Sequence, residues 1–276
     1  MTEHPLVSVV VPTRNNERTI RACLQSVRDQ TYPRVELIVV DNHSTDETLD
    51  IATELADVAV TGGPERSAQR NLGIAHAEGQ WVLWLDSDMM LPPRSIELAV
   101  RTATRTGATG VALPERTIGE GFWTACRALE RECYLNQPWL HNPRLVQRDY
   151  LLGEGGFHLG MSGPEDADLR LRMHAEGRGI ELAPIVVDHD EGRLTVPDVL
   201  RKRYYYGRSI PAFAGRHDGA VGAQGRAVLK SYAVNWRRLS RDPMHAAGMV
   251  VLRSLELVGY AAGARRGRRD RARVGS

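Results

Sequence analysis

The stretch that decides the fold is "VLWLDSDMML", residues 82–91. Its first four residues form an apolar run that is typical of a buried strand, and Asp86 and Asp88 follow at the end of that run. Unpaired carboxylates beside a core cost free energy, so we expect this strand end to face a cation or a ligand. A solvated turn or a helix cap is the alternative, because aspartate is also common there.

Three more apolar runs precede this strand, at residues 6–13, 35–42 and 58–62. They are rich in β-branched residues, as strands buried on both faces are. Segments with apolar residues at helical spacing separate the runs, which predicts crossover helices and a parallel sheet. These predicted helices are residues 16–30, 44–56 and 67–79, the second opened by a capping box of Ser44 and Glu47.

Polar residues stand where three of these strands end, at residues 13–15, 41–42 and 86–88. Ligands of open parallel sheets bind beyond the carboxyl ends of the strands. The aspartates are therefore predicted to lie at the edge of the sheet that holds the ligand.

The rest of the chain is less regular. Strands are predicted at residues 110–115 and 180–192, and the second ends in Asp188, His189 and Asp190. Residues 215–225 are predicted to form a flexible loop, and residues 265–276 to be disordered. Helices are predicted at residues 92–107, 121–136, 163–177 and 244–264.

Length and composition fit a soluble globular protein with one large domain, or one domain and an appendage. The chain has 276 residues, of which 42% are hydrophobic and 25% charged. The first residues lack the features of a signal peptide. Cys23, Cys126 and Cys133 have neither metal-site nor disulfide spacing, so reduced thiols and a cytoplasmic location are predicted.

Charge is distributed unevenly along the chain. From Arg201 onward there are 17 basic and 4 acidic residues, which gives +13, whereas the 19 basic and 30 acidic residues before it give −11. An apolar helix flanked by arginines is typical of an interfacial membrane anchor, although a helix docked on the core with a solvated tail fits as well. Arg253 and Glu256 argue against a membrane span. Nucleic-acid binding is not favoured, because no reader motif accompanies the arginines.

Four segments together resemble family 2 glycosyltransferases with the GT-A fold. They are "VSVVVPTRNNERTI", "ELIVVDNHSTDET", "SAQRNLGIAHAEGQWVLWLDSD" and "GPEDADLRLRM", and the resemblance covers roughly residues 6 to 207. It implies an α/β, Rossmann-like, mostly parallel sheet flanked by helices. We expect a catalytic domain at residues 1–191 and a helical, arginine-rich extension at residues 192–276.

The resemblance implies a divalent cation, Mn²⁺ or Mg²⁺, as cofactor. Asp88 would face the metal, Asp86 would reach the ribose or the metal's waters, and His189 would add a further ligand. A cation stabilises the charge that develops on a departing nucleoside diphosphate, and hard cations prefer carboxylate oxygens. For His189, hydrogen bonds to the flanking aspartates are the alternative.

The resemblance also implies a catalytic base in "GPEDADL", where Asp166 would take the proton of the acceptor hydroxyl and Glu165 would orient the acceptor or the base. Such a direct displacement inverts the anomeric centre. Ordinary acidity of a helix N-terminus is the alternative for this pair.

Further residues are assigned to the donor and the acceptor by the same resemblance, with surface-loop or core roles as alternatives. Asp41 would recognise the nucleotide base. The other donor residues are Pro12, Thr13, Asn15, Glu17, Arg66, Arg70, Asn71, Asp86 and Ser87. The acceptor residues are Trp123, Trp139, Arg144, Arg203 and Tyr206.

The sequence therefore predicts an inverting, metal-dependent transferase that uses a nucleoside-diphosphate sugar, with UDP as the favoured nucleotide. Its acceptor would be lipid-linked, a polysaccharide or a small molecule, at the cytoplasmic face of a membrane. A mannosyltransferase that uses GDP-mannose and polyprenyl phosphate, or a non-catalytic module that binds nucleotide sugars, are the alternatives.

Overall fold

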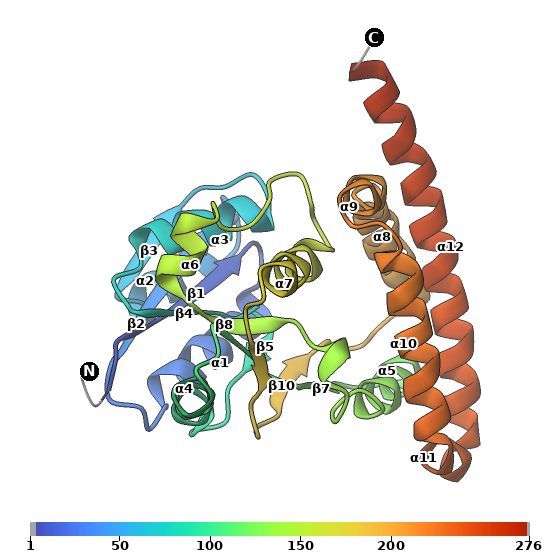
Figure 1. Cartoon of the computed structure of the whole chain (residues 1–276), viewed down its shortest axis with the longest axis horizontal. Helices are drawn as coiled ribbons and strands as arrows, with labels where there is room; N and C mark the ends of the chain where they lie inside the picture. Colours follow the sequence, from blue (N-terminus) through green and yellow to red (C-terminus); the bar gives the residue numbers. More distant parts are fainter. Residues whose placement is uncertain (1–3, 275–276) are drawn as a thin grey trace. The chain divides into compact units, whose positions relative to one another are not determined.

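The computed structural model describes residues 4–274, which divide into two units (Figure 1). The sheet unit consists of the residues up to Glu115 together with His141–Leu159 and Leu169–Asp190. The helical unit consists of Arg116–Leu140, Gly160–Asp168 and the residues from Glu191 onward. The chain thus passes between the units several times.

A seven-stranded sheet forms the centre of the sheet unit, in the order β3-β2-β1-β4-β8-β6-β9. The first four strands along the chain are parallel, as predicted, whereas β8 runs antiparallel to both of its neighbours and was not predicted. The strands are β1 Val7–Thr13, β2 Val35–Asp41, β3 Val58–Thr61, β4 Trp81–Trp84, β6 Gly110–Ala112, β8 Pro143–Gln147 and β9 Ile180–Leu182.

Helices cover both faces of this sheet (Figure 1). Alternate residues of β1 point to opposite faces, so that Val9 and Val11 join one core cluster and Val10 joins the other. The first cluster includes residues of α1 and α4, and the second includes residues of α3 and α6. Helices α1 Glu17–Arg28, α2 Thr48–Leu55, α3 Arg66–His76, α4 Ser95–Thr106 and α6 Arg148–Gly153 belong to this unit.

A short antiparallel pair beyond the end of β4 matters for the site. Strand β5 Met89–Met90 pairs with β10 Val187–Asp190, and His189 stands opposite Met89. The strand predicted at residues 180–192 is therefore two strands, β9 and β10, and the second of them brings His189 beside the aspartates of residues 86–88.

The helical unit is built around α5, α8 and the long α12 (Figure 1). Helices α8 and α12 approach closely because glycines line their contact: a Cβ at Gly263 would lie 2.1 Å from the carbonyl oxygen of Tyr204. The elements are β7 Glu115–Ile118, whose first residue belongs to the sheet unit, α5 Phe122–Glu132, the 3-10 helix η1 Pro138–Leu140, α8 Val196–Gly207, α9 Ile210–Arg216, α10 Ala220–Val234, α11 Trp236–Arg241 and α12 Pro243–Val274. Helix α7 Glu165–Ala175 has its first residues in this unit and the others in the sheet unit.

Three local predictions were wrong. The loop predicted at residues 215–225 is largely the first part of α10, and the tail predicted to be disordered continues α12 to Val274, with residues 275–276 outside the described part. Ser44 and Glu47 do not form a capping box, because α2 begins at Thr48 and Ser44 binds Asp41 instead.

Candidate active site

Three strands deliver polar side chains to one edge of the sheet unit. In the register of β1 and β2, Thr13 stands opposite Asp41, and Leu85, which follows β4, donates its backbone N–H to the carbonyl of Val10. The structure therefore brings the strand ends of residues 13–15, 41–42 and 86–88 to a common edge, as the sequence predicted. We call this edge the rim.

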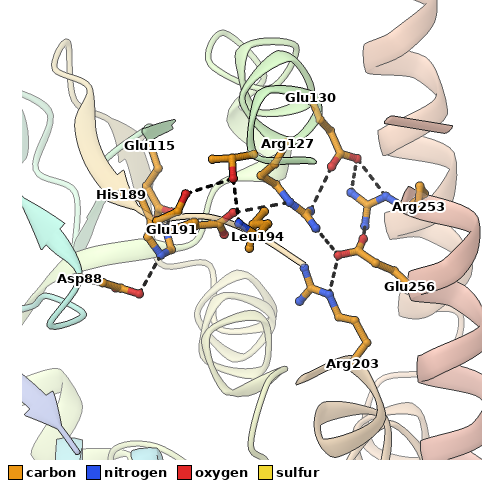
Figure 2. A network of polar contacts seen from close by, with 12 residues as sticks. Asp88, Glu115, Arg127, Glu130, His189, Glu191, Leu194, Arg203, Arg253 and Glu256 are labelled. Atoms are coloured by element: carbon orange, nitrogen blue, oxygen red, sulfur yellow. Dashed lines mark hydrogen bonds and ion pairs between the residues drawn. The ribbon is translucent and has the colours of Figure 1, made fainter. Parts of the chain in front are cut away.

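Asp88, His189 and Glu115 form a line of polar contacts at the rim (Figure 2). The Nε2 of His189 lies 3.3 Å from Oδ2 of Asp88, and its Nδ1 lies 3.4 Å from Oε2 of Glu115. The two strands are also tied together by the backbone N–H of Asp190, which donates to the carbonyl of Asp88 at 2.8 Å. Glu115 thus fixes the ring that faces Asp88.

These carboxylates decide the charge of the imidazole. Burial would lower the pKa of His189, but hydrogen bonds to Asp88 and Glu115 outweigh it and raise the pKa to about 9. At neutral pH the ring is therefore a positively charged imidazolium, with one N–H toward Asp88 and the other toward Glu115. A divalent cation beside Asp88 would replace that proton as the positive charge on Nε2.

Asp86 faces arginines. Its Oδ1 lies 3.0 Å from Nη2 of Arg70, and its Oδ2 lies 3.4 Å from Nη2 of Arg144. Burial would raise the pKa of Asp86, but the cationic side chains of Arg66, Arg144 and Arg70 hold it well below its usual range. Asp86 is thus an anchored anion at the base of the rim, and its predicted contact with ribose or metal stays a prediction.

Arg144 was assigned to the acceptor, and its surroundings are those of the rim. It lies on β8, next to β4 in the sheet, and its Nε donates to Oε1 of Glu115 at 2.8 Å. Arg144 therefore connects Asp86 with Glu115, so the same carboxylate holds both His189 and an arginine.

Arg70 is fully buried and is held by aromatic rings as well as by Asp86. Its guanidinium carbon lies 5.0 Å from the ring centroid of Phe157 and 5.9 Å from that of Trp84. Asn71 exchanges two hydrogen bonds of 2.8 Å with the backbone of Phe157. Asn71 thus positions the loop that carries this ring, and Arg66 begins the same helix.

Asp41 is completely buried and holds the turn that follows β2. It accepts hydrogen bonds from the backbone N–H of Ser44, at 2.8 Å, and from the Ser44 hydroxyl. Asn15, at a positive φ of 47°, donates its N–H to that hydroxyl at 2.8 Å, and its Oδ1 accepts from the N–H of Thr45. Recognition of a nucleotide base by Asp41 stays a prediction.

The other predicted donor residues close the same edge. Glu17 accepts from the backbone N–H of Glu47 at 3.2 Å, and the Ser87 hydroxyl accepts from Nδ2 of Asn16 at 2.7 Å. Pro12 and Thr13 are buried at the end of β1. The loops after β1, β2 and β4 are therefore tied to one another before any ligand binds.

The chemistry of the rim residues suits a divalent cation that is coordinated partly by the protein and partly by a bound substrate. Among residues 4–274 there is no group of three or more His, Cys, Asp or Glu side chains placed to enclose a metal ion. Asp88, with 30% of its side chain exposed, and His189 offer two ligands, and Glu115 orients the imidazole from behind. Cations that bind substrate phosphates need only one or two protein carboxylates, so a nucleoside diphosphate and water could supply the remaining oxygens.

Glu165 and Asp166 lie in the first turn of α7, in the part that belongs to the helical unit. Glu165 is buried and accepts from the backbone N–H of Gly163, whereas Asp166 is partly exposed. Gly163 has a φ of +106°, and a Cβ there would lie 2.7 Å from the ring of Tyr206. Glu165 and Tyr206 therefore shape the turn that presents Asp166.

The remaining predicted acceptor residues have contacts inside the helical unit. Trp123 packs edge-on against Phe122, with ring centroids 5.0 Å apart, and Lys230 lies 4.6 Å above the ring of Trp139. The Nε of Arg203 lies 2.7 Å from Oε1 of Glu256. Their roles in acceptor binding stay predictions.

Comparison with known proteins identifies the family. The family model described as Glycosyl transferase family 2 matches residues 8–159, which is more than half of the chain. The chain belongs to glycosyl transferase family 2. The matched segment carries the strand ends of the rim together with Arg70, Asp86, Asp88 and Glu115.

Curated relatives of this family-2 chain match about a third of it. EpsH of Bacillus subtilis is 38% identical over 107 residues, which are 37% of this chain and 31% of EpsH. The glycosyltransferase AglE of Haloferax volcanii is 35% identical over 112 residues, 37% of each chain. The match thus spans well under half of the length of these relatives.

Solved structures confirm the GT-A-type fold. A mannosyltransferase of Pyrobaculum calidifontis, in complex with GDP-Man and Mn²⁺, superposes with a TM-score of 0.65 at 20% identity over 98% of this chain and 88% of its own. Staphylococcus aureus TarS, residues 1–349, in complex with UDP-GlcNAc, superposes with a TM-score of 0.54 at 16% identity over 96% of this chain and 92% of its own.

Glu115 is the residue of the rim that the sequence analysis missed. It follows the apolar run of residues 110–114, and a carboxylate after such a run was the signal that identified Asp41 and Asp86. That signal alone does not show which histidine the carboxylate contacts, because Glu115 and His189 are 74 positions apart in the sequence.

Proposed function

We propose that this chain is an inverting, metal-dependent glycosyltransferase that moves a sugar from a nucleoside-diphosphate donor to a hydroxyl group. The observation that carries the proposal is the partly exposed carboxylate of Asp88, 3.3 Å from an imidazole nitrogen of His189. These are ligand types that Mn²⁺ and Mg²⁺ accept, and they stand at the sheet edge where such folds bind ligands.

The acidic and the basic residues of the rim would have different roles in the reaction. A bound divalent cation supplies Lewis-acid stabilisation to the departing diphosphate. Asp88 and His189 hold the position for that ion, and Glu115 keeps the Nε2 of His189 directed toward Asp88. Asp86 keeps the guanidinium groups of Arg70 and Arg144 at the rim, and these fixed positive charges favour the anionic leaving group.

Asp166 is proposed to be the general base. Its carboxylate takes the proton of the attacking hydroxyl while the bond between the sugar and the diphosphate breaks, so that configuration at the anomeric carbon inverts. Glu165 is buried against the backbone of Gly163, which favours a role in shaping this turn over contact with the acceptor.

UDP is the proposed nucleotide, and TarS, whose structure contains UDP-GlcNAc, supports it. GDP-mannose is the second candidate, because the mannosyltransferase of TM-score 0.65 holds GDP-Man and Mn²⁺. The acceptor is proposed to be lipid-linked, a polysaccharide or a small molecule, at the cytoplasmic side of a membrane. A thermal-shift screen of UDP- and GDP-sugars with Mn²⁺ separates the two donors, because only a matched donor stabilises the fold strongly.

The test of the enzyme itself combines two variants and a control. Asp88→Asn is expected to lose Mn²⁺-dependent donor binding and turnover, whereas Asp166→Asn is expected to keep donor binding and lose 10²–10⁴-fold in transfer rate, as is typical for a general base. Asp50→Asn, at an exposed position on α2, should behave like the parent chain. Transfer by Asp166→Asn at the parent rate would remove the assigned base. Tight donor binding without turnover on any acceptor would instead indicate a binding module.

A further inference from the structure

The middle part of the long helix α12 has its charged residues on the side that faces the protein and apolar side chains on the exposed side. Arg253 and Glu256 are the charged residues of its middle part. Glu256 is completely buried and contacts Arg127, Arg203 and Arg253 within the helical unit (Figure 2). The two charged residues that argued against a membrane span are therefore neutralised by partners in the protein.

The opposite side of α12 exposes almost only apolar side chains. Leu257 and Val258 are 62% and 63% exposed, and Ser254 is the polar residue among the exposed ones between residues 244 and 262. This stretch is roughly 27 Å long at 1.5 Å per residue. We define it as the outer face of α12: Met244, Ala247, Val250, Val251, Ser254, Leu257, Val258, Ala261 and Ala262.

Clusters of arginine stand beyond both ends of the outer face. Arg265, Arg266, Arg268 and Arg269 are exposed on the continuation of the same helix, with Asp270 as their acidic neighbour. At the other end α11 exposes Trp236 at 59%, together with Arg237, Arg238 and Arg241. Helix α10, with residues such as Leu229 at 66% exposure, adds apolar surface to the same unit.

We propose that the outer face of α12 lies on the surface of an anionic lipid bilayer. An apolar stripe with arginines beyond its ends matches an interface in which acyl chains lie beside negatively charged headgroups. By length and composition alone, Pro243–Arg271 is the helix among residues 4–274 that could cross a membrane. However, α5 and α8 cover its inner side, and α8 exposes the charged residues Asp198 and Arg201. The helix therefore lies along the bilayer surface and does not cross it.

Vesicle flotation of the full chain tests this surface. The protein is expected to float with vesicles of phosphatidylcholine and phosphatidylglycerol, and to float much less with phosphatidylcholine alone. Combined Val251→Gln, Leu257→Gln and Val258→Gln should reduce the bound fraction at least tenfold. Combined Arg265→Gln, Arg268→Gln and Arg269→Gln should reduce the preference for anionic vesicles, because it removes most of the arginine cluster at one end of the outer face. The matched control is Leu152→Gln with Leu159→Gln, two exposed leucines of the sheet unit, and it should float like the parent chain.

Three results would overturn the proposal. The first is no flotation of the parent chain, and the second is flotation at the parent level of the variant with glutamine at 251, 257 and 258, here called the triple glutamine variant. The third is a dimer in analytical ultracentrifugation that this variant abolishes, without any flotation of the parent chain. The last result would make the outer face a contact between two copies. Asp88→Asn is expected to float normally, and the triple glutamine variant to bind a soluble nucleotide sugar normally. Failure of the lipid surface is thus distinguishable from failure of the proposed enzyme.

Discussion

The rim of the sheet unit and the buried charges of the helical unit both combine carboxylates with cationic side chains, but they differ in the exposure of their central carboxylates, Asp88 and Glu256. We call the second group the charge network: Arg127, Glu130, Arg203, Arg253 and Glu256. In the network Glu256 is completely buried, and three arginines surround it (Figure 2). At the rim, by contrast, the side chain of Asp88 keeps 30% of its surface exposed, and its Oδ2 lies 3.3 Å from Nε2 of His189.

The difference separates charges that hold a fold from charges that can accept a ligand. Burial would raise the pKa of Glu256, but Arg127, Arg203 and Arg253 outweigh it and hold the pKa at about 2. Every oxygen of such a carboxylate is occupied by protein, so nothing is left for a substrate. Asp88 has surface left for an incoming cation, and we therefore expect network variants to lower stability and rim variants to lower binding.

The largest expected effect is that of Glu256→Ala. It leaves three arginines without their shared carboxylate in a buried site, and removal of one partner of a buried ion pair costs about 3–5 kcal/mol. The free energy of unfolding in urea measures this loss. The control is Glu54→Ala, which breaks the exposed pair of Glu54 with Arg21 and should leave stability unchanged. A Glu256→Ala protein as stable as this control would contradict the claim that the charge network stabilises the fold.

Lowering the pH should reduce the free energy of unfolding through protonation of Glu256, by less than the Glu256→Ala substitution does. The pKa of Glu256 is lowered from 4.5 to about 2 in the folded protein, so the unfolded chain binds the proton first as the pH falls. The stabilisation by Glu256 is therefore fully present above about pH 4.5 and is lost progressively toward pH 2, by up to about 3 kcal/mol. The measurement is the pH dependence of the free energy of unfolding for the parent chain and for Glu256→Gln. The difference between the two should shrink across this window, and a constant difference would contradict the assignment.

The sequence predicted the parallel half of the fold because those strands have a strong local signal. Strands β1, β2 and β4 are predominantly apolar, with polar residues at or just after their ends, and the order of strands and helices determines their direction. Strand β8 begins with Pro143 and contains Arg144, so its local signal is weak. Helix α10 was mistaken for a loop because glycines at 219, 222 and 225 are typical of turns, although the structure has them at the start of a helix.

Residues of the site could be predicted where they follow a strand, and their partners could not. Asp86 and Asp88 were recognisable from the apolar run before them, and His189 from its place after another. The contact of Arg144 with Asp86, however, joins residues 58 positions apart through an antiparallel strand. In the same way the sequence showed Glu256 in an apolar helix, but not Arg127, its partner 129 residues earlier.

Glu115→Gln tests the rim with an effect of intermediate size. The amide removes the negative charge that orients His189, and loss of such a carboxylate behind a metal ligand typically costs 10–100-fold in metal affinity or activity. Titration calorimetry of a nucleotide sugar, with and without Mn²⁺, measures this loss. Glu120→Gln, at an exposed position five residues later, is the matched control. Equal donor affinity in the two variants would show that Glu115 has only a structural role.

The smallest expected effect concerns a hydroxyl group of the network. Tyr134 donates to Oε1 of Glu130 at 2.6 Å and accepts from Nη2 of Arg253 at 2.9 Å. Because Glu130 keeps its other partners, Tyr134→Phe should lower the free energy of unfolding by about 1.5 kcal/mol, the low end for a hydrogen bond to a charged group. Tyr205→Phe, which loses a 3.4 Å contact at an exposed position, should cost less. Both variants should bind a nucleotide sugar like the parent chain. Weakened binding in Tyr134→Phe with unchanged stability would mean that the charge network serves the ligand, and the separation between the network and the rim would fail.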